Sequence, residues 1–153
     1  MSLRHLCVLL VGLVSVLVAL SPMPASAQVT PGLRAGISVD PDQFYVGGHI
    51  ETGALVDRLH FRPNIEVGFG DNVTLVALNF EFVYRFQSRR PWHIYAGAGP
   101  AVNLYNFDGG GDNTEAGFNI LFGAENRRGL FFEMKVGVSQ SPDLKFGVGY
   151  AFH

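Results

Sequence analysis

The sequence predicts an all-β protein: an eight-stranded antiparallel up-and-down closed transmembrane β-barrel, preceded by a cleavable signal peptide. Three observations carry this prediction. Large apolar residues alternate with other residues through eight segments, glutamates fall within those segments while aspartates fall between them, and an apolar leader precedes them all. A period of two in hydrophobicity indicates β-strands with one apolar face. Aspartate favours turns because its short side chain bonds to its own backbone.

Residues 1–27 are typical of a secretory signal peptide. A basic start and an uninterrupted apolar stretch over residues 7–20 lead to Ala25-Ser26-Ala27, the small-residue pattern that signal peptidase recognises. We therefore expect cleavage after Ala27, with Ala25 as the second recognition residue. A retained helical anchor is the alternative, but the apolar stretch is shorter than the roughly 20 residues that a helical span needs.

Residues 28–153 are then expected to form one outer-membrane β-barrel domain. Cys7, the only cysteine of the chain, lies in the leader, so a mature chain would have neither a disulfide nor a thiol nucleophile. The whole chain holds 11 basic and 13 acidic residues, and removal of Arg4 with the leader makes the balance more acidic. This charge gives no indication of a nucleic-acid partner.

The eight alternating segments are bounded by turn-forming residues. They cover residues 32–39, 44–51, 58–68, 74–86, 92–105, 115–125, 130–138 and 143–152. Their lengths match the roughly nine to eleven residues of a tilted strand that crosses a bilayer. Short connections between consecutive segments favour sequential antiparallel neighbours.

Alternation alone leaves open which face of the strands points inward. A soluble lipocalin-like barrel would hold its apolar face around a ligand, whereas an outer-membrane barrel turns that face towards lipid. Most glycines within the segments share the parity of the glutamates, as expected of the narrow interior of a small barrel. The opposite parity carries aromatic residues such as Phe80, Phe82 and Phe122, which are too bulky to fill such an interior. We therefore expect the apolar face to contact lipid.

The inward face is then charged and almost balanced. It carries Arg34, Glu51, Arg62, Glu66, Glu81, Arg85, Glu115, Glu125, Glu133, Lys135 and Lys145. Buried charges are tolerable only when they are paired and hydrogen-bonded. We expect a lumen charge network that fills the barrel, and a polar path for ions or small solutes remains the alternative.

The connections alternate in charge along the chain. Those after the first, third, fifth and seventh segments are acidic, and those after the second, fourth and sixth are mainly basic. Because alternate connections share one end of a meander, one rim is expected to be acidic and the other basic. Export would place both termini, and with them the basic rim, in the periplasm. The stretch from Tyr105 to Asn113 is expected to be the longest loop and the best candidate for external contact.

With these features in view, the chain resembles the small outer-membrane β-barrels of Gram-negative bacteria, the OmpA/OmpX-like class. The most specific element is the final segment, where Leu144, Phe146, Val148, Tyr150 and Phe152 alternate up to the end and only His153 follows. The resemblance implies that these five residues are the assembly signal read by the barrel-assembly machinery. It also implies outer-membrane lipids and lipopolysaccharide as partners.

Pro63 and Pro100 depart from the pattern, because each removes a backbone donor inside a predicted strand of a barrel without edges. We expect a bulge or a local break at one or both.

The sequence favours a protein without catalysis. An active-site serine would have to come from Ser38, Ser88, Ser139 or Ser141, which lack the histidine spacing of lipid-cleaving barrels. A metal site from His49, His60 and His93 is possible in principle, but interior histidines with ordinary hydrogen bonds are the simpler interpretation. We expect no metal and no cofactor. The predicted function is a structural, envelope-stabilising or surface-interaction role in the outer membrane. The alternatives are a narrow pore or transporter for small solutes or hydrophobic compounds, and a soluble lipocalin-like lipid-binding barrel.

Overall fold

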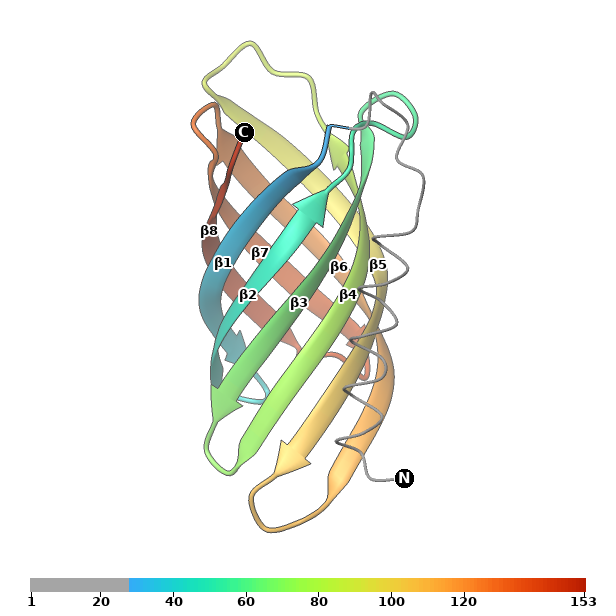
Figure 1. Ribbon diagram of the computed structural model, residues 1–153, viewed down its shortest axis with the longest axis vertical. Coiled ribbons are helices and arrows are strands. Elements are labelled where there is room, and N and C mark those ends of the chain that lie inside the picture. The colour runs from blue at the N-terminus through green and yellow to red at the C-terminus, as the bar shows by residue number, and fades with distance from the viewer. Residues whose placement is uncertain (1–27) are drawn as a thin grey trace.

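The computed structural model describes residues 28–153, whose strands follow one another around a closed barrel in chain order (Figure 1). The strands are β1 Thr30–Val39, β2 Gln43–Glu51, β3 Leu59–Gly70, β4 Val73–Arg85, β5 Trp92–Phe107, β6 Asp112–Asn126, β7 Leu130–Ser139 and β8 Leu144–Ala151. All neighbours are antiparallel, and β8 pairs with β1 to close the barrel. The all-β, eight-stranded, up-and-down architecture is thus confirmed. The predicted leader, with the cleavage signal at Ala25 and Ala27, lies outside the described residues.

The described part of the chain contains no helix that is long and apolar enough to cross a membrane.

Strand ends lie close to the predicted ones, with one clear difference. The stretch from Tyr105 to Asn113, expected to be a loop, is mostly strand: β5 continues to Phe107 and β6 begins at Asp112. The turn between them contains Gly110 and Gly111, both with positive φ, which glycine adopts without steric cost. Figure 1 shows the resulting β5–β6 hairpin as the part of the barrel that projects furthest at its end.

The two faces of the strands differ as the alternation predicted. Large apolar side chains point away from the barrel and are exposed, as for Leu33 at 60%, Phe44 at 53% and Phe132 at 52%. The intervening polar side chains point into the lumen and are buried, among them Arg62 and Glu81 at 0%. An apolar outer surface and a charged interior are the arrangement of a barrel that stands in lipid.

The two prolines interrupt the hydrogen-bond ladder without shifting the register. Thr52 N donates to Phe61 O, so alternation along the antiparallel pair places Pro63 at a hydrogen-bonded position opposite Ile50, where the β2–β3 ladder stops. By the same alternation Pro100 lies opposite Phe80, where the β4–β5 ladder is missing. The expected local breaks therefore occur at both prolines, and each removes a donor from one seam only.

Glycine is required where neighbouring strands approach closely inside the lumen. A Cβ on Gly36 would lie 2.8 Å from the ring of Tyr45, which lies over β1 and extends towards Gly147 on β8. A Cβ on Gly99 would collide with the backbone of Phe80 on β4. These positions explain why glycines share the parity of the charged residues.

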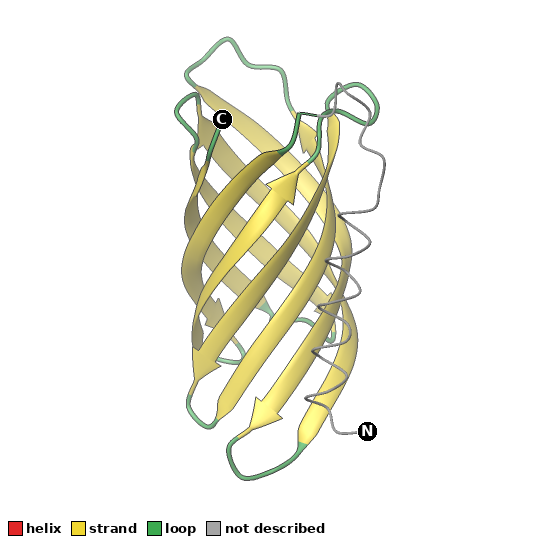
Figure 2. Cartoon of the chain, in the orientation of Figure 1, coloured by secondary structure: helices red, strands yellow, loops and turns green. Residues whose placement is uncertain are grey.

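The connections fall at two ends, as expected of a meander (Figure 2). The β1–β2, β3–β4, β5–β6 and β7–β8 connections share one end, which we call the acidic end after Asp40, Asp42, Asp71, Asp108 and Asp143. The other three connections lie at the opposite end with the C-terminus, and we call it the basic end after Arg58, Arg89, Arg90, Arg127 and Arg128.

Candidate functional site

A cluster of buried charged side chains fills the middle of the lumen. It comprises Arg34, Arg62, Glu66, Glu81, Glu133, Lys135 and Lys145, and we call it the central network. Its members come from β1, β3, β4, β7 and β8, and none is more than 6% exposed. Period-two alternation explains their shared direction, because each occupies the inward parity of its strand.

Glu66 on β3 has three basic partners in the central network. Its Oε1 accepts from Lys135 Nζ at 2.7 Å, and its Oε2 accepts from Lys145 Nζ at 2.6 Å. Arg34 Nη1 approaches Oε1 at 3.4 Å. One carboxylate thus joins cations from three other strands across the lumen.

Glu133 on β7 joins the two arginines. It accepts from Arg34 Nη1 at 2.8 Å, from Arg62 Nη2 and from the Tyr95 hydroxyl at 2.8 Å. Arg34 also donates to Nδ1 of His49 at 3.1 Å, and because a guanidinium has no acceptor this ring nitrogen carries no proton. Charge-assisted bonds of this kind are stronger than neutral ones.

Glu81 completes the central network by ion pairs alone. It lies 2.6 Å from Lys135 Nζ and 3.5 Å from Arg62 Nη2, but neither contact has hydrogen-bond geometry. Four basic groups therefore face three carboxylates, which leaves the central network with a net charge of +1. Such a charge is tolerable in a dry interior only because each carboxylate is shared between several cations.

Buried uncharged side chains on the neighbouring strands β4, β5 and β6 lie between the central network and the basic end. Val83, Tyr95 and Leu121 are fully buried and form the apolar cluster of the lumen. The Tyr95 ring lies between two guanidiniums, with Arg62 at 5.0 Å and Arg85 at 5.6 Å from its centroid. Cation–π contacts of this kind are strongest when the cation is desolvated.

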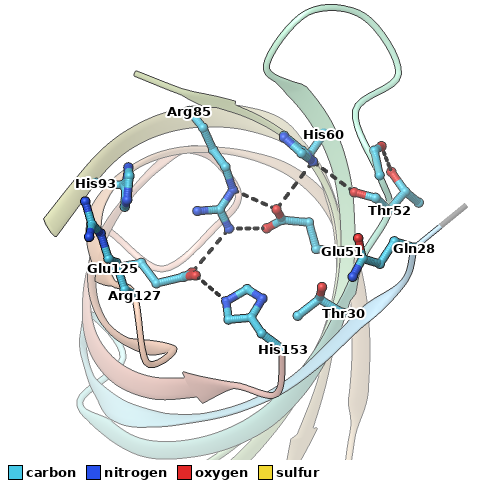
Figure 3. Close-up of a pocket in the computed structure, with 11 residues that line it drawn as sticks. Gln28, Thr30, Glu51, Thr52, His60, Arg85, His93, Glu125, Arg127 and His153 are labelled. Atoms are coloured by element: carbon cyan, nitrogen blue, oxygen red, sulfur yellow. Dashed lines mark hydrogen bonds and ion pairs between the residues drawn. The ribbon is translucent and has the colours of Figure 1, made fainter. Parts of the chain in front are cut away.

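Beyond Tyr95 a cavity of about 430 Å³ opens at the basic end. We call it the basic-end cup and define it by Glu51, His60, Arg85, His93, Glu125, Arg127 and His153 (Figure 3). Arg85 donates from Nε and Nη2 to both oxygens of Glu51, at 2.8 and 2.9 Å, and from Nη2 to Glu125 at 3.2 Å.

The histidines of the basic-end cup use the remaining carboxylate positions. His153 Nε2 lies 2.8 Å from Glu125 Oε1, and His60 Nδ1 lies 3.5 Å from Glu51 Oε1. His60 Nδ1 also lies 2.9 Å from the carbonyl oxygen of Thr52. The four carboxylate oxygens of the cup are therefore all in contact with cationic or imidazole groups of the chain.

The acidic end of the lumen is closed by polar side chains and backbone. Asn79 Nδ2 donates to Asn64 and Asn119 Nδ2 donates to Asn79, at 2.7 and 2.8 Å. Closer to the acidic end, Asn103 Nδ2 donates to the carbonyl oxygen of Gln140 at 2.9 Å. This hydrogen bond holds the β7–β8 connection over the opening of the lumen, where Ser141 is only 7% exposed.

The structure differs from the sequence prediction for one of the eleven charged residues. Glu115 lies on the projecting part of β6, where it is partly exposed and accepts a hydrogen bond from Asn113 Nδ2 at 2.7 Å. Among residues 28–153 it makes no ion pair, so it belongs to neither the central network nor the basic-end cup. The β6 strand extends beyond the pairing that ends at Gly117 and Ser139, which carries Glu115 out of the lumen.

The other ten predicted charged residues belong to two separate clusters. Glu51, Arg85 and Glu125 belong to the basic-end cup, and the other seven form the central network. Sequence reasoning missed the roles of Tyr95, which lies between the clusters, and of His153, which it treated only as an extra terminal residue. The parity of Tyr95 pointed inward, but no sequence signal places the last residue of a chain.

The three histidines considered for a metal are not brought together. His49 contacts Arg34 in the central network, whereas His60 and His93 line the basic-end cup. Within residues 28–153 no group of three His, Cys, Asp or Glu side chains has the geometry to hold a metal ion.

The serines with side-chain hydrogen bonds contact the backbone or an amide. Ser38 Oγ donates to Pro41 O, Ser88 Oγ accepts from Arg90 N, and Ser141 Oγ accepts from Asn103.

Comparison with known proteins shows a similarity of fold but no closer relationship. No family model matches the sequence, and no curated protein matches it. Among solved structures, the crystal structure of Neisserial surface protein A superposes with a TM-score of 0.58 at 16% identity, covering 83% of this chain and 99% of that one. A de novo designed transmembrane β-barrel gives 0.57 at 14% identity, covering 85% and 98%. At these identities the likeness is one of fold, and the chain has the closed eight-stranded fold of small outer-membrane β-barrels.

Proposed function

We propose that the protein is a non-catalytic outer-membrane barrel with a sealed lumen and a structural, envelope-stabilising or surface-interaction role. The single observation that supports this most strongly is the central network, whose seven charged side chains meet across the full width of the lumen. The polar closure at Asn103 supports it independently. An eight-stranded barrel has an interior just wide enough for side chains to fill, which favours a sealed lumen over an open path.

Current through single molecules in planar bilayers tests the sealed lumen. The refolded chain should give no steady single-channel steps. A double variant, Glu81→Ser with Lys135→Ser, removes one buried pair with no net change of charge and should give measurable steps, which shows that the assay detects an open lumen. Stable steps from the unmodified chain would refute the sealed lumen and favour the pore.

Membrane fractionation with gel migration before and after boiling tests the location. A folded barrel should fractionate with the outer membrane and migrate faster before boiling than after it. A soluble chain without heat-dependent mobility would instead support a soluble lipid-binding barrel.

The charges at the two ends support an orientation in the outer membrane. The acidic end would face outwards, where its carboxylates bridge divalent cations to lipopolysaccharide phosphates, and the basic end would face the periplasmic leaflet. In bilayers containing lipopolysaccharide, Mg²⁺ should raise the unfolding temperature of the barrel. Replacing Asp71 and Asp143 by Asn should remove part of that increase, and an unchanged Mg²⁺ response would contradict the proposed contact.

A further inference from the structure

The basic-end cup has hydrogen-bond donors left over and no carboxylate oxygen left over. Both oxygens of Glu51 accept from Arg85, and the two oxygens of Glu125 face Arg85 and His153. Figure 3 shows these interactions as dashed lines around Arg85. The acceptors that would attract a cation are therefore already in use.

The unused donors gather on one side of the basic-end cup. Within residues 28–153, neither the Arg127 guanidinium nor the His93 ring makes a hydrogen bond or ion pair. His93 pairs with Glu125 across β5 and β6, and Arg127, in the turn just after β6, lines the cup together with them. The third nitrogen of Arg85, Nη1, also has no dashed line in Figure 3 and lies on the side of His93.

We propose that the basic-end cup binds a phosphate group through Arg127, His93 and Arg85 Nη1. A guanidinium offers donors in a fork that matches phosphate oxygens, and the paired carboxylates hold Arg85 in place for this contact. The cavity of about 430 Å³ leaves room for the organic part of a phosphate ester beside the phosphate itself. Arginines of the surrounding connections, such as Arg89 and Arg128, add a positive field at the same end.

The phosphate site does not depend on a sealed lumen, because the basic-end cup is separated from the central network by Tyr95. Failure of the conductance test would therefore leave the phosphate site untouched, and failure of phosphate binding would leave the sealed lumen untouched.

Histidine-selective NMR of the full chain refolded in a maltoside detergent, which carries no phosphate group, tests the site. Inorganic phosphate should shift the ring resonances of His93 with a saturable dependence on concentration. His49 serves as an internal control, since it contacts Arg34 of the central network, away from the basic-end cup, and should not shift. Chloride at matched ionic strength should have no such effect.

Two neighbouring arginines give a matched pair of variants. Arg127→Gln should weaken phosphate binding about tenfold, which corresponds to the loss of one charge-assisted hydrogen bond. Arg128→Gln removes the same charge from the next residue, which does not line the cup, and should leave the dissociation constant within about twofold. His93→Asn provides a second variant inside the cup, and its binding should also weaken. Heat-dependent gel mobility verifies that each variant is folded.

The source of the phosphate is resolved by replacing the detergent with a phospholipid. In nanodiscs of phosphatidylglycerol without added phosphate, a lipid headgroup in the cup would move the His93 resonances and abolish the response to soluble phosphate. An unchanged spectrum and an unchanged phosphate response would point to a soluble phosphate ester. The proposal is overturned if no saturable shift occurs, if chloride acts as strongly as phosphate, or if the two arginine variants weaken binding equally.

Discussion

The neutral substitution Glu66→Gln should strongly destabilise the barrel. Glu66 is 1% exposed and binds Lys135 and Lys145 through separate oxygens, at 2.7 and 2.6 Å. Glutamine keeps the size of the side chain but removes its charge. Two buried lysines then lose their shared partner, and Arg34 loses a carboxylate at 3.4 Å.

The magnitude follows from the charge balance of the central network. Four basic groups face three carboxylates in the unmodified chain, and four would face two in the variant, so the net charge rises from +1 to +2. Breaking a buried ion pair by removing one partner costs about 3–5 kcal/mol, because the remaining charge stays buried without compensation. We expect Glu66→Gln to lower the free energy of unfolding by that amount.

Urea-dependent unfolding in lipid vesicles, followed by the fluorescence of Trp92, measures the change. Glu115→Gln is the matched control, because it makes the same chemical replacement on an inward-parity glutamate that forms no ion pair within residues 28–153. Its effect should stay within about 0.5 kcal/mol, as for most exposed substitutions. If Glu66→Gln costs no more than Glu115→Gln, the central network does not hold the barrel together as argued.

Three further changes test the seams, the outer face and the final strand. Pro100→Ala supplies an amide donor opposite Phe80 O. The new hydrogen bond should stabilise the barrel by more than the larger conformational entropy of the unfolded chain destabilises it, so the free energy of unfolding should rise by about 1 kcal/mol in the same assay. Phe80→Arg places a charge on the outer face and should cost about 2–4 kcal/mol in vesicles, and a barrel unaffected by it would not be standing in lipid at this level. Phe152→Ala should lower the yield of heat-shifted barrel in the outer membrane, whereas deletion of His153 should not, and the opposite order would show that the terminal histidine belongs to the assembly signal.

The sequence predicts the strands well because their cause is local. Each segment shows the alternation of apolar and polar residues independently of the others. The alternation is needed because one face of each strand contacts lipid and the other faces a narrow lumen. The inward direction of Arg34, Glu66 and Lys135 follows from parity alone. Parity does not predict which of these side chains meet, because the pairing of Arg34 with Glu133 joins β1 to β7, which are not neighbouring strands, and depends on tilt and register.

Glu115 shows where parity fails. The β5–β6 hairpin continues past the end of β7 at the acidic end, so an inward-parity side chain there faces solvent beyond the lumen. Glycine, asparagine and aspartate between Tyr105 and Asn113 indicated a loop, but cross-strand pairs such as Leu104 with Thr114 extend the ladder. Tertiary pairing thus overrides local turn preference.

The charged residues of the lumen also specify which face of each strand points inward. If the interior were apolar, both faces of β3, β7 and β8 would be alike, and a slip of one residue in register would cost little. A triple variant with methionine at Glu66, Lys135 and Lys145 separates this role from stability. It leaves Arg34 and Arg62 facing Glu81 and Glu133, so the remaining charges balance.

Balanced apolar replacement of buried ions is often neutral for stability, so the triple variant should be within about 1 kcal/mol of the unmodified chain in unfolding. Its folding yield should nevertheless fall, because three strands lose charged side chains that distinguish their inner face from their outer face. A triple variant as unstable as Glu66→Gln would mean that the buried charges stabilise the barrel outright. A triple variant with full stability and full yield would mean that the outer face alone, with residues such as Phe132 and Phe146, specifies which side of each strand meets lipid.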